Sequence, residues 1–224
     1  AARPTGHAAL LDRRRTRMTD KLIRDALILW ATIDPIGTLA IFASITGGLT
    51  EAARRRTALK AVLYAGGILV GAVIIGQVLL TAMGIRLVSL QVAGGIILFL
   101  FGLKMVFGTP LMQGSTQGEP GHDIAVFPLA VPSIATPGAL MAVIILTDNH
   151  VYPIQVQLAT TGVMLLVLLA TFLFMLAAGR IIAVIGQNGS AILVRVMGML
   201  LAALSIELVM EALNIFDLLN TSTN

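Results

Sequence analysis

The chain has 224 residues, of which 57% are hydrophobic and 12% are charged. Soluble domains carry about 25% charged residues, so this composition excludes an ordinary water-soluble protein and predicts an integral membrane protein. The net charge is +4, but basic clusters in so apolar a chain are typical of loops at a cytoplasmic membrane face. We therefore expect contacts with membrane lipids and no nucleic-acid partner.

A helix needs roughly 20 mostly apolar residues to cross the hydrocarbon core of a bilayer, and six segments meet this requirement. They predict an all-α polytopic membrane protein. The predicted spans are Ala26–Leu49, Ala61–Ile85, Leu87–Phe107, Ile124–Thr147, Val156–Val184 and Ala191–Ile215.

The spans divide into two groups of three, with polar segments around them. We expect a polar, basic N-terminal tail at 1–21, a first three-helix repeat at 22–108, a connecting loop at 109–123, a second three-helix repeat at 124–216 and a polar C-terminal tail at 217–224.

The first predicted span contains one charged residue, Asp34, in the stretch TIDPIGT (32–38). Asp is a good helix N-cap, and Pro is favoured at the first helical position, where its missing N–H costs nothing. The pair Asp34-Pro35 therefore predicts that one helix ends and another begins near the middle of the membrane.

The fourth predicted span repeats this pattern with a hydroxyl cap, because Thr136 precedes Pro137 and Gly138. Non-helical backbone at this depth is tolerated only where it is buried in protein or lines a wet cavity. The alternative, that each proline only kinks a packed helix, remains open.

The two halves of the chain are related by a weak repeat. A shift of 102 residues places Pro35 on Pro137, and a shift of 103 places Gly95 on Gly198. Since three spans per repeat is an odd number, the second copy must enter the membrane from the opposite side. The sequence thus predicts two inverted three-helix repeats with broken helices 1 and 4, an architecture of many secondary transporters.

Two half-helix N-termini near one midplane would favour a carboxylate or another small anion. Asp34 has two interpretations, a structural cap or a group that couples transport to a proton or to a cation such as sodium. The candidate substrate-binding residues are Asp34, Pro35, Gly37, Thr38, Ser133, Thr136, Pro137 and Gly138.

Glycines in several spans predict close helix packing rather than a site, namely Gly67 with Gly71, the pair Gly94-Gly95, and Gly198 with Ala202. The chain has no cysteine, its three histidines lie in polar connecting segments, and no second aspartate or H-E-x-x-H motif lies in a span. We therefore expect no metal site, no cofactor and no enzyme activity.

Three motifs in this order, DPIGT (34–38), GGIILFLFGLKM (94–105) and AVFPLAVPSIATPGAL (125–140), resemble the MarC family of bacterial membrane proteins. The resemblance extends from Leu22 to Phe216. It implies six spans, kinship with the LysE-like exporter superfamily, and transport of small neutral amino acids in some members. The matching residues are Asp34, Pro35, Gly37 and Thr38 in the first motif and Pro132, Pro137 and Gly138 in the last.

The chain departs from the family pattern at both breaks. The family commonly has Asn and then Pro where Thr38 and Ala40 stand, and Gly-Pro-Gly where Thr136, Pro137 and Gly138 stand. The expected function is secondary transport or export of small neutral amino acids or similar solutes by alternating access. A non-transporting accessory or scaffold protein is the main alternative, a metal-ion exporter is disfavoured, and a homo-oligomer is left open.

Counts of Lys and Arg predict the orientation. Over the whole chain the two sides carry eight and seven, but counting from Met18 leaves three on the side of the N-terminus and seven on the other. We therefore predict a multi-pass protein of the bacterial inner membrane, with the segment ARRRTALK in the cytoplasm and both termini outside.

Overall fold

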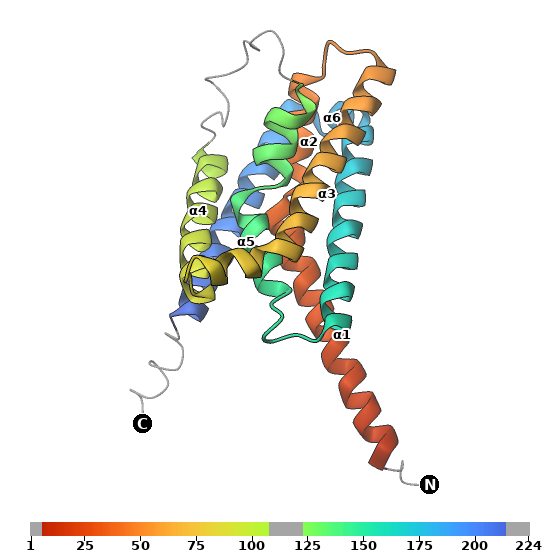
Figure 1. The fold of residues 1–224 in the computed structure, drawn as a ribbon. Coiled ribbons are helices and arrows are strands. Elements are labelled where there is room, and N and C mark those ends of the chain that lie inside the picture. Colours follow the sequence, from red (N-terminus) through yellow and green to blue (C-terminus); the bar gives the residue numbers. More distant parts are fainter. Residues whose placement is uncertain (1–5, 108–122, 214–224) are drawn as a thin grey trace.

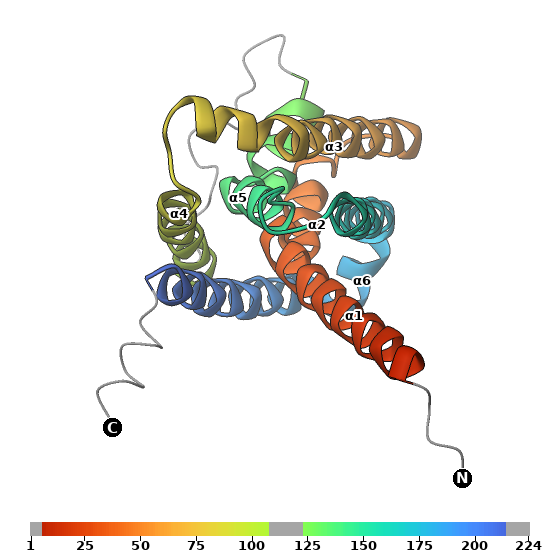
Figure 2. The same cartoon turned by 60° about the horizontal axis from the view of Figure 1, so that its bottom comes forward.

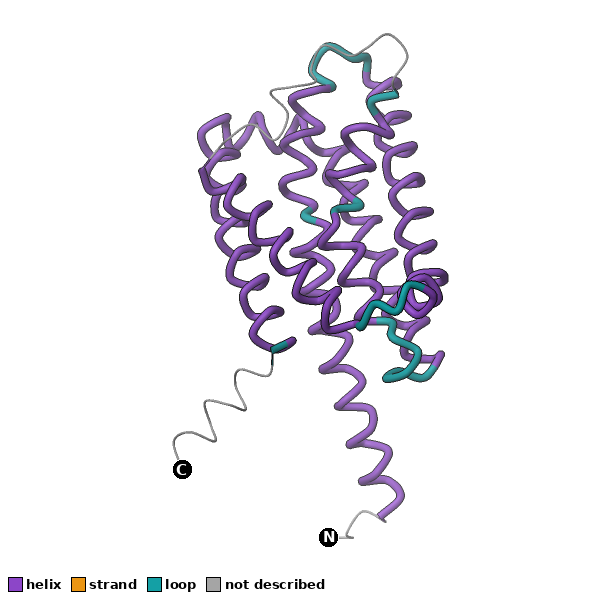
Figure 3. Tube along the Cα trace, turned by 60° about the vertical axis from the view of Figure 1, so that its left-hand side comes forward, coloured by secondary structure: helices purple, strands orange, loops and turns teal. Residues whose placement is uncertain are grey.

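The computed structural model describes residues 6–107 and 123–213, and all regular secondary structure in this part of the chain is helical (Figure 1 and Figure 3). The predicted connecting loop at 109–123, apart from Asp123, and the predicted C-terminal tail lie outside the described residues. The helices are α1 (Gly6–Ile33), α2 (Pro35–Ile45), α3 (Glu51–Ala82), α4 (Leu87–Phe107), η1 (Ala125–Ile134), α5 (Pro137–Leu146) and α6 (Ile154–Ala212).

Five described segments are long and apolar enough to cross a membrane, and the pair of η1 and α5, bent by 55°, makes six if it counts as one span. Helix α6 contributes two of the five, because Gly186 (φ 70°) breaks its helical backbone. The all-helical, multi-pass membrane class is therefore confirmed. The five segments are Met18–Ile45, Glu51–Ala82, Leu87–Phe107, Ile154–Gly186 and Ala191–Ala212.

Two helices begin earlier than their predicted spans. Helix α1 begins at Gly6, within the predicted tail, and α3 begins at Glu51, where the Thr50 hydroxyl accepts a hydrogen bond from the Ala53 amide. Both added stretches are rich in Ala, Leu and Arg, which favour helix, and contain no internal Gly or Pro. Hydropathy marks where a helix meets the edge of the membrane, so it misses helical turns that continue into water.

The first span forms the interior of the bundle. In its most apolar 18-residue stretch 56% of the residues are buried, against 17% for α3. Leu29, Ile33 and Phe42 are fully buried, and the view from below places α2 and α5 among α3, α4 and the two parts of α6 (Figure 2). The outward side chains of α3, such as Ile74 and Val78, are apolar and exposed, which suits contact with lipid.

Helix α4 crosses the second part of α6 at glycines. A Cβ atom added at Gly102 would lie 2.8 Å from the carbonyl oxygen of Gly198, and one added at Gly95 would lie 2.6 Å from a side chain of α6. The close packing predicted at Gly95 and Gly198 is therefore confirmed. The packing predicted at Gly67 and Gly71 is wrong, because a Cβ atom added at either would have nothing within 4 Å.

Candidate functional site

The helical backbone of the first span is interrupted at Asp34, between α1 and α2. Asp34 has left-handed backbone angles (φ 52°, ψ 69°) and is the one non-glycine residue with positive φ in the described part of the chain. Its Oδ1 accepts a hydrogen bond of 2.9 Å from the Gly37 amide, and Pro35 begins α2. Asp tolerates this backbone region better than most residues because its short side chain bonds locally. The carboxylate thus caps a helix that starts inside the bundle.

Helix α5 begins in a similar way at Thr136. The Thr136 Oγ1 accepts a hydrogen bond of 2.8 Å from the Ala139 amide, and Pro137 follows as the first helical residue. Thr136 is 1% exposed. Both helix starts therefore have their own side-chain cap, and both caps are buried.

The two helix starts are connected by side-chain hydrogen bonds. Thr136 Oγ1 donates to the carbonyl oxygen of Thr32 at 2.8 Å, an acceptor that a continuous helix would have paired with the amide of residue 36. Thr38 Oγ1 lies 3.0 Å from Ser133 Oγ and also donates to the Ser133 carbonyl at 3.3 Å. Residues about 100 positions apart in the sequence are thus brought into one buried polar cluster.

A small cavity of about 70 Å³ lies beside this cluster. Asp34, which is 5% exposed, is the one carboxylate within residues 6–107 and 123–213 that lines it. The space exceeds the roughly 10–15 Å³ that one water needs and is far below the roughly 300–1,000 Å³ of ligand pockets. In this conformation it can therefore hold a water or a small cation next to Asp34, and not a larger solute.

Two larger cavities flank the small one. One, of about 490 Å³, lies among α2, α3, α4 and α6 and is lined in part by Arg54 and Arg195. The other, of about 330 Å³, lies between α4 and η1 and is mainly apolar. Ala40, Met105 and Val194 border both the small and the 490 Å³ cavity, and Ile41, Phe101 and Ser133 border both the small and the 330 Å³ cavity.

Residues 19–216 match the family described as "MarC family integral membrane protein", which is most of the chain. The chain belongs to the MarC family. This confirms the resemblance that the three sequence motifs predicted.

Relatives of this MarC-family protein include the UPF0056 inner membrane protein YhgN of Escherichia coli (strain K12), 28% identical over 198 residues, which cover 88% of this chain and 98% of the relative. The UPF0056 inner membrane protein MarC of Escherichia coli O1:K1 / APEC is 28% identical over 206 residues, covering 84% and 91%. A UPF0056 membrane protein of Buchnera aphidicola subsp. Schizaphis graminum (strain Sg) is 32% identical over 187 residues, covering 80% and 85%. No solved structure matches the chain. These names agree with the apolar helices in indicating a membrane protein.

The structure of this MarC-family protein divides the eight candidate site residues into three groups. Four line the small cavity, namely Asp34, Gly37, Thr38 and Ser133. Pro137 is exposed and, with Ser133, lines the 330 Å³ cavity. The remaining three, Pro35, Thr136 and Gly138, are buried at the helix starts and line none of these three cavities.

Both glycines among the candidate site residues have a steric role. A Cβ atom added at Gly37 would collide with the Asp34 carboxylate, and one added at Gly138 would collide with the Leu98 side chain. Gly37 therefore permits the cap at Asp34, whereas Gly138 permits packing of α5 on α4. The carboxylate of Asp34 occupies the start of α2, so this N-terminus is not open for the anion that the sequence analysis expected there.

A second buried polar cluster, which the sequence analysis did not identify, joins α1 to α6. Asp25 is 1% exposed, its Oδ2 lies 2.5 Å from Lys21 Nζ, and it accepts a hydrogen bond of 2.6 Å from Thr160 Oγ1. Lys21 also donates to the Leu146 carbonyl at 3.4 Å. The four-residue spacing of Lys21 and Asp25 was the available signal, since residues i and i+4 share a helix face.

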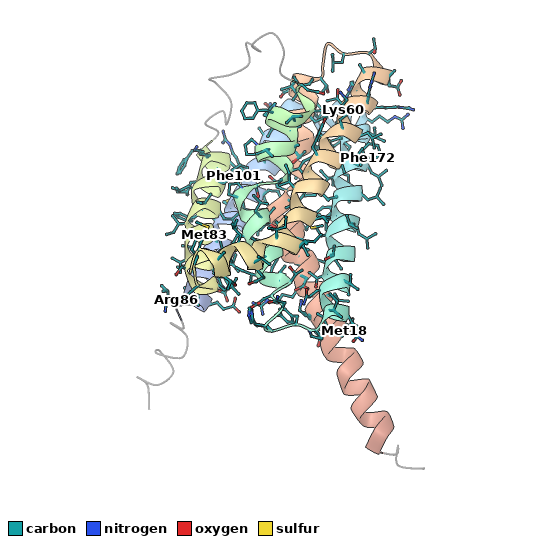
Figure 4. The ribbon with its side chains drawn as sticks, in the orientation of Figure 1. Met18, Lys60, Met83, Arg86, Phe101 and Phe172 are labelled. Atoms are coloured by element: carbon teal, nitrogen blue, oxygen red, sulfur yellow. The ribbon has the colours of Figure 1, made fainter. Side chains whose placement is uncertain are left out.

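This cluster lies at the end of the bundle where Met18 is found, opposite Lys60 (Figure 4). Lys21 Nζ lies 4.1 Å from the ring centroid of Tyr152, in the turn before α6. Burial raises the pKa of the Tyr152 hydroxyl above its ordinary value of 10.0, and the negative charge of Asp25 adds to this effect. Among the described residues no group of three or more His, Cys, Asp or Glu side chains could hold a metal ion.

Proposed function

We propose that this MarC-family protein is a secondary transporter of small neutral amino acids or similar small solutes, and that it works by alternating access. The observation that carries the proposal is the buried junction of two helix starts, where Thr136 bonds to Thr32 beside the cavity that holds Asp34. Broken helices that meet around a polar site are the usual way for membrane transporters to hold a solute or coupling ion.

The course of the helices supports an inverted repeat. In Figure 1 the unit of α1 and α2 runs from the lower to the upper end, α3 returns, and α4 runs upward again. The pair η1 and α5 runs downward, the first part of α6 upward and its second part downward. The two sets of three thus cross in opposite senses, and the caps Asp34 and Thr136 lie 102 positions apart.

The packing of the third and sixth spans supports the same relation. A shift of 103 places Leu98 on Leu201, and both side chains are buried in one apolar cluster between α4 and α6. This pair is therefore the natural centre of a two-fold relation between the repeats.

Close backbone contacts lie symmetrically about that centre. Gly102, four positions after Leu98, approaches the carbonyl of Gly198, three positions before Leu201. Gly95 lies three positions before Leu98. A Cβ atom added at Gly95 would lie 3.1 Å from the carbonyl oxygen of Ser205, which is four positions after Leu201. Inverted repeats related by a two-fold axis would place their contacts in this way.

Asp34 is proposed as the coupling group. A carboxylate in the middle of a span is costly unless it is paired, neutralised or functional. Within the described residues Asp34 forms no ion pair, and its hydrogen bond comes from an uncharged amide. A proton or a small cation such as sodium, taken up in the adjacent cavity, would neutralise it.

The two ends of the bundle differ in a way that suits alternating access. The 490 Å³ cavity reaches the end at which α2 ends and α3 begins, because Ser44, Gly47 and Arg54 line it. At the other end the buried Lys21–Asp25 pair joins α1 to Thr160 of α6. We assign this conformation to a state open at the α2–α3 end and closed at the other.

The test is uptake or efflux of labelled small amino acids by purified protein in liposomes, under imposed proton or sodium gradients. We expect gradient-driven transport that Asp34→Asn abolishes, while Asp20→Asn, a control at an exposed position, leaves it unchanged. Inertness toward every small solute would favour the accessory or scaffold alternative. Transport of divalent cations alone would favour the metal exporter.

A further inference from the structure

A cationic cavity lies next to the Asp34 site. Its volume of about 490 Å³ falls within the roughly 300–1,000 Å³ of ligand pockets. Small or apolar side chains form most of its wall, to which Ser44 adds one hydroxyl. Among the residues that the structure describes, its two charged lining residues are both arginines, Arg54 and Arg195, and no carboxylate lines it. A wall of this kind attracts an anionic group.

Arg54 is half-buried, and its guanidinium packs against residues inside the bundle. Its guanidinium carbon lies 5.7 Å from the ring centroid of Phe42, which is fully buried. Its Nη1 would lie 3.3 Å from a Cβ atom added at Gly179, so the missing side chain of Gly179 leaves room for the guanidinium. The Nε atom of Arg54 is buried and has no hydrogen-bond partner. A buried donor without a partner is unfavourable, so the protein itself does not satisfy this side chain.

Two neighbouring basic residues, Arg55 and Lys60, differ from Arg54 in this respect. Arg55 pairs with Glu51 at 2.8 Å, and Lys60 pairs with Asp123 at 2.6 Å. Within the described residues, no ion pair or side-chain hydrogen bond involves the guanidinium of Arg54 or of Arg195. The guanidinium groups of Arg54, which is half-buried, and of Arg195, which is exposed, are therefore both available to a ligand.

The position of the cavity indicates which ligand this is. Ala40, Met105 and Val194 separate it from the small cavity that contains Asp34. A solute that passes between the two would meet guanidinium groups on one side and a carboxylate on the other. A zwitterionic α-amino acid carries the two complementary charges, and the planar guanidinium fork matches the two oxygens of a carboxylate.

We propose that Arg54, together with Arg195, forms a subsite that binds the carboxylate group of the transported solute. The subsite rests on the proposed transport function and deepens it, because it predicts that solutes carrying an acidic oxygen group bind more tightly than solutes that lack one. Phosphate in a lipid headgroup has the same chemistry, so the experiment must separate the two sources.

The test measures equilibrium binding of labelled alanine and of labelled ethylamine, which lacks the carboxylate, to purified protein in phosphatidylcholine nanodiscs. We expect Arg54→Gln to weaken alanine binding at least about tenfold, the loss of one charged bidentate contact, and to leave ethylamine binding unchanged. The affinity of Arg54→Lys for alanine should lie between that of the unmodified protein and that of Arg54→Gln, because lysine keeps the charge without the planar guanidinium fork. Arg55→Gln, which removes an exposed, paired arginine of the same helix, is the matched control and should bind alanine like the unmodified protein.

Several outcomes would overturn the subsite. The first is that Arg54→Gln binds alanine as well as the unmodified protein does. The second is that Arg54→Gln loses alanine and ethylamine binding equally, which would indicate a structural role for Arg54. The third is that the unmodified protein does not bind alanine. If Arg54→Gln changes only the retention of phosphatidylglycerol in mixed nanodiscs, the cavity binds a lipid headgroup and the subsite is also overturned. Arg54-dependent alanine binding without any transport in liposomes would keep the subsite and refute the transport function.

Discussion

The hydroxyl of Thr136 donates a 2.8 Å hydrogen bond to the carbonyl oxygen of Thr32, and in this way the start of α5 is attached to the end of α1. The same hydroxyl accepts from the Ala139 amide at 2.8 Å, so one side chain caps its own helix and bridges to another. The contact between the end of α1 and the start of α5 is therefore held by a side chain.

Thr136→Val tests this bridge. Valine matches threonine in shape but removes the donor and the cap, and it leaves the buried Thr32 carbonyl and Ala139 amide without partners. We expect a loss of about 1–3 kcal/mol in the free energy of unfolding, measured as a fall in Tm in detergent. Thr136→Ser keeps both bonds and should be close to the unmodified protein. Equal stability of the two variants would mean that the bridge contributes nothing.

Asp34 should respond differently to Asn and to Ala. Asn caps a helix about as well as Asp, so Asp34→Asn should fold and insert normally but lose gradient-driven transport. Asp34→Ala also loses the cap, at about 0.5–2 kcal/mol, and should lower both expression and transport. Transport in liposomes and Tm are measured together. An Asn variant that transports at the unmodified rate would leave Asp34 as a cap only.

Gly37→Ala should disrupt the same cap from the opposite side. The added Cβ atom would collide with the Asp34 carboxylate, so the hydrogen bond to the residue 37 amide must lengthen or break. We expect Tm to fall by an amount comparable to Asp34→Ala. Gly67→Ala is the matched control, because an added Cβ has nothing within 4 Å there. A Gly37→Ala protein as stable as the control would show that α2 does not depend on this cap.

The Lys21–Asp25 pair should behave as a buried ion pair. Lys21→Met leaves Asp25 buried and charged, with Thr160 as its remaining partner, and should cost about 3–5 kcal/mol. Adding Asp25→Leu to Lys21→Met should recover part of the loss, since no unpaired charge then remains. Arg24→Gln breaks the exposed pair with Glu211 and should cost less than about 1 kcal/mol. Denaturation of these three variants and of the unmodified protein gives the comparison, and a double variant no more stable than Lys21→Met alone would contradict a coupled pair.

Reporter fusions test the predicted orientation. Since α1 begins and α6 ends at the same end of the bundle (Figure 1), both termini should give the same result. We expect a C-terminal fusion to an extracytoplasmic reporter such as alkaline phosphatase to be active, and a fusion to a cytoplasm-dependent fluorescent reporter to be dark. The opposite pair of results would reverse the orientation and place the Arg54 cavity at the outer face.

Local chemistry in the sequence was sufficient to predict several features. Long apolar runs predicted the membrane-spanning helices, because the backbone in lipid must satisfy its own hydrogen bonds and does so within a helix. Asp-Pro and Thr-Pro-Gly predicted helix starts at Pro35 and Pro137, where α2 and α5 begin, because cap and first-turn preferences involve residues within three positions of each other. The three motifs were sufficient to predict the family.

Only the tertiary structure decided which distant residues meet. The partner of Thr136 is Thr32, the partner of Asp25 is Thr160, and Arg54 faces a cavity while Arg55 faces Glu51. None of this follows from residue types, since helix packing depends on the rotation and crossing of each helix, which several turns of side chains determine together. For the same reason the glycines at 67 and 71 have no close neighbour while Gly102 touches α6. The sequence by itself determined where helices start and that they enter a membrane, and the packing decided which of their polar groups became a site.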